Sequence, residues 1–150
     1  MTTAPRSRAQ RRHDTEHRLA HDVDVWVASA SADGLPYLVP LSFDWDGEAL
    51  LVSTPANSPT GRNMAATRRV RVGLGHTRDV SMIDGTVEVL EMDALPRDRG
   101  DRFAARTGFD PRTLTTPYRW FRITPHRVQA WREVDELPER ELMRAGLPVT

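Results

Sequence analysis

Apolar and polar residues alternate along the first part of the chain in a way typical of β-strands. Residues 23–27 alternate, and after Asp33-Gly34 the alternation continues over residues 37–45 up to Asp46-Gly47. A period of two is that of a strand with one buried face, and Asp-Gly is a strong signal for a tight hairpin turn. A third apolar run follows at residues 49–52. We therefore predict three sequential strands in an antiparallel meander.

The next segment predicts a short helix and two more strands. Ser58-Pro59 has the pattern of an N-cap followed by proline in the first helical turn, and we expect a helix over residues 61–67. Alternation returns at residues 70–74 and again at residues 81–92. Asp84-Gly85 lies inside the second of these runs, where it predicts a bulge or another turn.

The last third of the chain predicts a helix, a long strand and a short terminal helix. Residues 93–107 are helical in composition, with Gly108 placed to end the helix and Gly100 weakening its middle. Residues 118–134 carry the next β pattern, which Pro125 should bend or break. We expect residues 136–144 to form one more helix.

These elements predict a mainly β fold, a six-stranded antiparallel barrel with short helices as connections. Meander order excludes a doubly wound parallel sheet, and closure would remove exposed strand edges. Residues 1–20 are rich in arginine and poor in large apolar groups. We expect them to be a flexible polar arm leading into a short helix, with the first twelve residues dispensable, and residues 21–150 to be the single folded domain.

The amino-acid composition limits the kinds of catalysis, metal binding and partners that the protein can have. The chain has no cysteine, which excludes disulfides, Cys-ligated metals and thiol nucleophiles. Its 21 basic residues are all arginine, so lysine-based covalent catalysis is excluded and any anion site must use Arg, hydroxyls or N–H groups. Because 21 acidic residues balance them, we expect no nucleic-acid partner. No apolar run is long enough for a bilayer and no signal-peptide pattern occurs, so we expect a cytoplasmic protein that does not enter membranes.

Histidines offer weak catalytic or metal signals. His13, His17 and His21 would share one helical face and make a zinc site conceivable, but a solvated polar helix is the better interpretation because little apolar support surrounds them. His76 and His126 stand alone, each near the end of a strand. The sequence has no nucleophile elbow, phosphate-binding P-loop or dinucleotide fingerprint.

One segment does predict a phosphate site. Strand residues Ser53 and Thr54 are followed by a loop and then by a helix start that contains Thr60, Arg62 and Asn63. Hydroxyls, the first N–H groups of a helix and an arginine around one point would bind phosphate. The alternative is an ordinary capped helix. Pro40 in the middle of a strand, with the aromatic residues of the last strand, would suit a planar ligand lying against the barrel.

Taken together, several motifs resemble those of the pyridoxamine 5′-phosphate oxidase-like superfamily of flavin- and deazaflavin-binding split barrels. The resemblance covers roughly residues 24–144. The motifs in chain order are residues 25–29 with the turn at 33–36, Val39-Pro40-Leu41-Ser42-Phe43, residues 51–54 followed by Gly61-Arg62-Asn63-Met64, residues 69–72, residues 85–89 and residues 122–131.

The resemblance implies an FMN-binding type of split barrel, a homodimer with two cofactor sites, and FMN or the deazaflavin coenzyme F-420 as cofactor. It implies that Val39, Pro40 and Ser42 lie against the ring, that Ser53, Thr54, Arg62 and Asn63 hold the phosphate, and that Trp120 approaches from the partner chain. Many relatives have a lysine where this chain has Thr60, so Arg62 or Arg69 would have to compensate.

The implied activity is that of an oxidoreductase passing a hydride to a small unsaturated molecule, with a deazaflavin-dependent reductase as the closest branch. Three alternatives stay open: an FMN-dependent oxidoreductase, a protein that binds or sequesters the cofactor without turnover, and an empty barrel that serves as a dimeric interaction scaffold. No acid or base is assigned, and His76 and Tyr118 are the first candidates.

Overall fold

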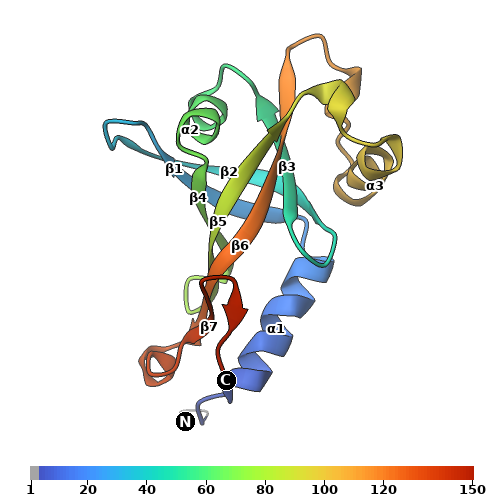
Figure 1. Ribbon diagram of the computed structural model, residues 1–150. Helices are drawn as coiled ribbons and strands as arrows, with labels where there is room; N and C mark the ends of the chain where they lie inside the picture. The colour runs from blue at the N-terminus through green and yellow to red at the C-terminus, as the bar shows by residue number, and fades with distance from the viewer. Residues whose placement is uncertain (1–3) are drawn as a thin grey trace.

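The computed structural model describes residues 4–150, and Figure 1 shows strands wound into a barrel with helices at its ends and side. The strands are β1 (Asp24–Ala30), β2 (Pro36–Trp45), β3 (Leu50–Pro55), β4 (Arg69–His76), β5 (Asp79–Leu90), β6 (Tyr118–Arg132), β7 (Glu141–Arg144) and β8 (Leu147–Pro148). The helices are α1 (Arg8–His21), α2 (Pro59–Thr67) and α3 (Arg97–Thr107), with 3-10 turns at Met92–Ala94, Pro111–Thr113 and Val134–Glu136.

The sheet closes on itself. Its strands run in the order β3-β2-β1-β4-β5-β6, all neighbours are antiparallel, and β3 also pairs with β6. This last pairing extends from Leu50 opposite Ile123 to Pro55 opposite Tyr118. The predicted mainly β, six-stranded antiparallel barrel is therefore confirmed, and β7 and β8 extend the sheet beyond β6.

Two apolar clusters hold the barrel and its helices. The larger one fills the interior and contains alternate residues of the strands, including Leu50 and Val52 of β3. Leu51 between them points outward and packs with Phe103 of α3 and Trp120 of β6. Because successive side chains of a strand face opposite ways, one apolar run supplies both clusters.

A bulge in β6 bends the barrel opposite Asp84-Gly85. Asp84 pairs with Arg127, whereas Gly85 pairs with Pro125, so His126 has no residue opposite it. A side chain at Gly85 would place its Cβ 2.5 Å from the Cγ2 of Ile123. Of the two predicted possibilities, a bulge is what forms, and β5 continues through it without a turn.

Two predicted helices differ from the structure. Residues 93–107 divide into a 3-10 turn and α3, and Gly100 is buried within α3, where a Cβ would lie 2.6 Å from the guanidinium of Arg112. The expected helix at residues 136–144 is wrong, because Glu141–Arg144 forms β7 and pairs with β6. Glu139, at positive φ, turns the chain before this strand.

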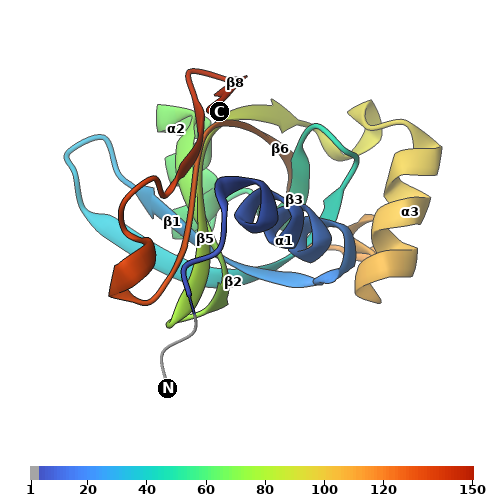
Figure 2. The same ribbon diagram turned by 90° about the horizontal axis from the view of Figure 1, so that it is seen from below.

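The short helix expected after the arm does form, but it begins at Arg8 and takes up most of the segment predicted to be flexible. Ser7 caps α1, which lies across one end of the barrel (Figure 2). Leu19 of this helix reaches the interior cluster, and Arg11 is buried with its guanidinium donating to the carbonyl oxygens of Ala130 and Glu136. Arginine contacts replace the missing apolar anchor, so the expectation that residues 1–12 are dispensable loses its basis. Residues 1–3 of the predicted arm lie outside the described residues.

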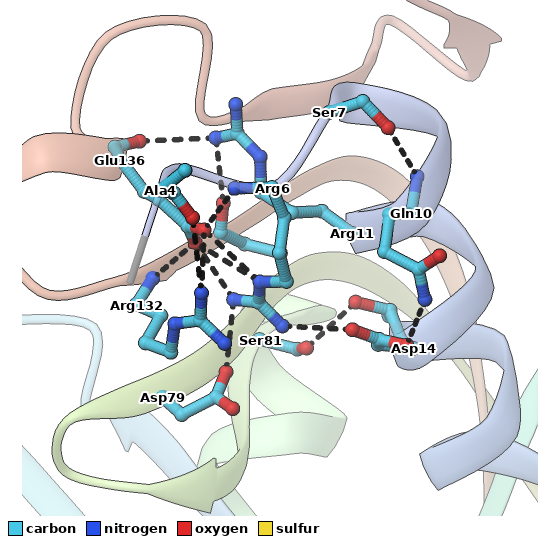
Figure 3. Close-up of polar contacts among 12 residues, drawn as sticks. Ala4, Arg6, Ser7, Gln10, Arg11, Asp14, Asp79, Ser81, Arg132 and Glu136 are labelled. Carbon is cyan, nitrogen blue, oxygen red and sulfur yellow. Dashed lines mark hydrogen bonds and ion pairs between the residues drawn. The ribbon is translucent and has the colours of Figure 1, made fainter. Parts of the chain in front are cut away.

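A buried carboxylate joins the two ends of the chain (Figure 3). Glu136 accepts hydrogen bonds from the guanidinium of Arg6 at 2.7–3.2 Å, from the backbone N–H of Arg6 at 2.7 Å and from that of Arg132 at 2.6 Å. Arg6 also contacts Asp14 at 2.9 Å and Asp79 at 3.1 Å. Burial opposes ionisation of Glu136, but these donors outweigh it and lower its pKa to about 2.

Replacing this carboxylate tests the attachment. We expect Glu136→Gln to lower the free energy of unfolding by about 1–3 kcal/mol at neutral pH, because Arg6 would lose its buried charge partner. The folded-state pKa lies below the ordinary value of 4.5, so this stabilisation is complete above that value and is lost as the pH falls through about 2. Denaturant unfolding across acidic pH should show parent and variant converging. Glu88→Gln, an exposed substitution on β5, is the control. A difference in unfolding free energy between the parent and Glu136→Gln that did not depend on pH would contradict the assignment.

Candidate functional site

The N-terminus of α2 is largely satisfied by its own cap. The Oγ of Ser58 accepts a hydrogen bond from the N–H of Gly61 at 3.0 Å, and the carbonyl oxygen of Ser58 accepts one from Arg62 at 2.9 Å. Pro59 has no N–H to offer. Within residues 4–150 the N–H of Thr60 is therefore the free donor of this first turn. A phosphate at this point would meet one backbone donor rather than several.

The hydroxyls predicted to hold a phosphate face the protein. Ser53 donates to the carbonyl oxygen of Arg119 at 2.9 Å, and Thr54 lies 3.3 Å from the hydroxyl of Ser58. Thr60 is 1% exposed, and its Oγ1 has no hydrogen-bond partner among the described residues. Three of the predicted phosphate ligands are thus buried, and a phosphate role for them stays a prediction.

Arg62 and Asn63 are the accessible members of the predicted set. The guanidinium of Arg62 folds back to donate to the carbonyl oxygen of Asn57 at 2.5 Å and remains exposed. The amide of Asn63 donates to the hydroxyl of Ser29 at 3.1 Å, which ties α2 to β1. Asn63 thereby fixes how α2 sits over the end of β1.

The predicted ring-binding residues of β2 divide between two faces. Val39 pairs with the fully buried Val27, whereas Pro40 and Trp26 pair as neighbours on the outer face and both are exposed. Ser42 shares the outer face by alternation and donates to Asp24 at 2.9 Å. Only the outward residues of β2 are placed where a ligand outside the barrel would touch them.

Trp120 lies apart from the other predicted residues. Its side chain is 0% exposed, its ring meets Phe103 edge to face at 5.1 Å between centroids, and its Nε1 donates to the carbonyl oxygen of Met92 at 3.2 Å. The predicted approach to a cofactor would require an exposure that Trp120 does not have. In this structure it holds α3 against the barrel.

A groove that the sequence analysis did not single out runs along the outer face of β1, β4 and β5. Its volume is about 450 Å³. Arg71 binds Asp84 through two hydrogen bonds of 2.5 and 3.1 Å, which raise the pKa of Arg71. Arg69 has no side-chain partner within residues 4–150, so the groove has an excess of positive charge. It is lined by Ala28, Ser29, Ala30, Arg69, Val70, Arg71, Asp84, Gly85 and His126.

A second hollow of about 250 Å³ continues this outer face toward β2. It contains Trp26, Pro40 and Gly73, and the pairing places Trp26 opposite Gly73 and Ala28 opposite Arg71. The groove and the hollow therefore lie along the same side of the β1–β4 pair. In the sequence, this face corresponds to the residues that alternate with the inward-facing ones of β1, namely Trp26, Ala28 and Ala30.

The candidate acids and bases occupy other places. His76 is exposed at the hairpin between β4 and β5, and Tyr118 packs against Phe109 with ring centroids 5.7 Å apart. Neither lines the groove, whereas His126 does. On α1, the rings of His17 and His21 stack at 4.2 Å.

Residues 4–150 offer neither a metal centre built from His, Cys, Asp or Glu clusters nor a membrane-spanning helix. Within this range no cluster of three or more His, Cys, Asp or Glu side chains is arranged to hold a metal ion. None of the helices described is both long and apolar enough to span a membrane.

A family model described as pyridoxamine 5′-phosphate oxidase matches residues 16–132, which is most of the chain. The chain belongs to the pyridoxamine 5′-phosphate oxidase family. This confirms the resemblance inferred from the motifs. No curated protein matches the chain significantly.

Solved structures similar to this member of the family have the same fold at low identity. One described as an F420 reductase has a TM-score of 0.58 and 21% identity, over 75% of this chain and 94% of that one. An FAD-binding protein from Mesorhizobium loti has a TM-score of 0.65 and 22% identity, over 79% and 90%. A putative pyridoxamine 5′-phosphate oxidase from Listeria innocua has a TM-score of 0.60 and 17% identity, over 81% and 97%.

The loop before α2 supplies a test of the local geometry. A Cβ at Gly61 would overlap the carbonyl oxygen of Pro55 and lie 3.1 Å from that of Ala56. We expect Gly61→Ala to cost about 1–3 kcal/mol in the free energy of unfolding, since backbone must move to accommodate the methyl group. Gly73→Ala is the control, because its nearest neighbour is the flexible Met82 side chain at 3.5 Å. Equal thermal stability of the two variants would show that the loop is free to move.

Proposed function

We propose that the protein is an oxidoreductase that binds a phosphate-bearing flavin or deazaflavin, FMN or coenzyme F-420, along the outer face of β1 and β4. In the proposed reaction a hydride passes between the cofactor and a small unsaturated molecule. The observation that carries this proposal is an exposed strand face with small and apolar residues in its middle and an unpaired arginine at one end. Membership of the family supports it.

The shape of this face fits a planar ring. Ala28 and Ala30 put only methyl groups between a ligand and the strand, so a flat ring system can approach closely. Pro40 and Trp26 extend the same face as an apolar surface. Burying both sides of a ring against such a surface contributes roughly 25 cal/mol for each Å² of apolar area removed from water.

The charge at the other end fits a phosphate. Asp84 is neutralised by Arg71, which leaves Arg69 free for a charge-assisted, bidentate contact with an anion. Arg62 is a second accessible cation, held by Asn57 on the loop before α2. These arginines would supply the positive charge that is missing at Thr60, the position where many relatives have a lysine.

The cofactor, when bound, supplies the hydride, and the chain supplies binding, orientation and electrostatics. The strand face orients the ring, and the arginines fix its phosphate-bearing chain. His126, on the bulge of β6, is the histidine that lines the groove. We assign it no proton transfer.

A homodimer is part of the proposal. Trp26 is 53% exposed and Leu38 is 60% exposed on adjacent strands, an apolar surface that a second chain would cover. Ala28 pairs with Leu38, so the same contact would enclose a ring lying on β1. Each cofactor site would then be completed by the partner chain.

A second candidate is binding or sequestering of the cofactor without turnover. Two observations favour it. Thr60 is buried at a position where many relatives have a cation, and His126 is the one histidine that lines the groove. Titration with FMN and with the deazaflavin, followed by assay of the reduced cofactor against unsaturated acceptors, separates the two. Binding with no consumption of reduced cofactor across the panel favours the second candidate.

The anion assignment predicts the effect of two substitutions. Arg69→Ala and Arg62→Ala should each weaken FMN or deazaflavin binding roughly tenfold to a hundredfold, the loss of about 1.5–3 kcal/mol expected for a hydrogen bond to a charged group. Arg97→Ala on α3 is the matched control. Fluorescence titration with a phosphate-free analogue should show no difference among the variants. If Arg69→Ala binds as tightly as the parent, the groove is not the phosphate site.

The dimer assignment predicts a change of mass. Light scattering of the parent should give twice the mass of one chain, and Leu38→Glu should give one chain mass because a charge would be buried in the contact. Leu114→Glu, at another exposed leucine, should leave the dimer intact. A monomeric parent at micromolar concentration would remove the shared-site part of the proposal.

A further inference from the structure

The helix that lies across the end of the barrel is too polar to fill it. In its 14 residues, α1 has Leu19 as its one large apolar side chain. It covers barrel residues that are strongly apolar, among them Ile83, Val128 and Leu142. A helix packed on such a surface normally presents a broad apolar stripe to it. Here the match is incomplete, and space remains beneath the helix.

This space is a cavity of about 390 Å³ between α1, the turn from β2 to β3, β6 and β7. Its lining includes Ile83, Val128 and Leu142, all buried, which we call its floor, together with Trp45 and Met143. The volume lies within the range of about 300–1,000 Å³ typical of small-molecule sites. A mostly apolar cavity holds water poorly, because water there lacks hydrogen-bond partners.

Polar contacts at the margins hold α1 in place and keep it from collapsing onto the floor. Arg12 donates to the carbonyl oxygens of Leu142 at 3.0 Å and Val149 at 2.7 Å, and Thr15 contacts the hydroxyl of Ser81 at 2.7 Å. An inward movement of the helix would break these contacts, so they favour the position of α1 that leaves the cavity open.

The rim of the cavity is acidic. Glu16 of α1 is exposed and has no ion-pair partner within residues 4–150. Glu48 on the turn after β2 has Arg122 at 3.6 Å and is otherwise exposed. Arg12 also lines the cavity, and the carbonyl oxygens to which it donates do not cancel its charge, so the lining carries two carboxylates against one guanidinium.

We propose that this cavity is a second ligand site, which takes a small molecule with an aromatic or branched apolar body and a protonated amine. The body would fill the space above Ile83 and Leu142, and the amine would lie at the rim beside Glu16. The ring of Trp45 adds a favourable surface for a cation. None of the residues lining this cavity lines the groove on β1 and β4, so the site is independent of the proposed function.

The test compares three probes that share one body and differ in charge, phenylpropylamine, phenylpropanol and phenylpropionate. Calorimetric titration of the full-length protein should give the order amine, alcohol, carboxylate, with roughly tenfold or more between the first and the last. In methyl-labelled protein the signal of Met143 should shift on binding, whereas that of Met64, buried elsewhere in the core, should not.

Two variants locate the site. Glu16→Gln should weaken the amine roughly twofold to fivefold, as expected for an exposed ion pair, and leave the alcohol unchanged. Glu88→Gln is its control. Met143→Trp should fill the cavity and abolish binding of all three probes, with circular dichroism confirming that the variant is folded.

Each result decides the matter. Equal binding of the three probes, absence of binding, or a Met143 signal that does not move would overturn the proposal. An unchanged amine affinity in Glu16→Gln would also overturn it. We expect this variant to fold, because residue 16 is exposed. If the amine dissociates a dimer, the cavity is a contact between chains and not a ligand site.

Discussion

The hydrogen bonds between β3 and β6 close the sheet, and this closure gives every strand an inner and an outer face. The inner residues fill one apolar cluster, which leaves two open ends and an outer wall. Helix α2 covers one end, α1 covers the other, and α3 packs on the wall against Leu51 and Trp120. Both proposed sites follow from this division, one on the outer wall and one beneath the helix at an end.

Guanidinium groups do much of the attachment that apolar side chains provide elsewhere. Asp44 on β2 is buried and contacts Arg102 at 3.1 Å and Arg106 at 3.4 Å. Arg106 also donates to the carbonyl oxygens of Leu19 and Asp22, so one side chain joins α3 to the C-terminal end of α1. A planar guanidinium can satisfy several acceptors at once, which explains how a chain without lysine secures polar helices to a barrel.

Sequence periodicity was sufficient for the barrel but not for its attachments. Alternation predicted the six strands, Ser58-Pro59 predicted the start of α2, and Asp84-Gly85 marked the bulge. The attachment of Arg6 to Glu136 joins residues 130 positions apart, and no local pattern reveals such a pair. Short β7 was mistaken for a helix because its four residues are too few to show a period.

Only part of the candidate site could be predicted, because its arrangement depends on contacts between residues far apart in the sequence. Pro40 is unusual for a strand interior, and it lies on the exposed outer face. Trp120 was chosen for its aromatic ring, yet closure of the barrel turns it toward α3. Arg69 entered only as a substitute cation, since its place in a groove depends on how β4 packs beside β1 and β5.

The attachment of Arg6 to Glu136 links the stability of two segments that are far apart in the sequence. The family match spans residues 16–132, so both partners lie outside the shared region, one before it and one after it. Neither end gains a buried charge partner without the other. The two terminal segments are therefore coupled in stability, because loss of either side chain leaves the other buried without this partner.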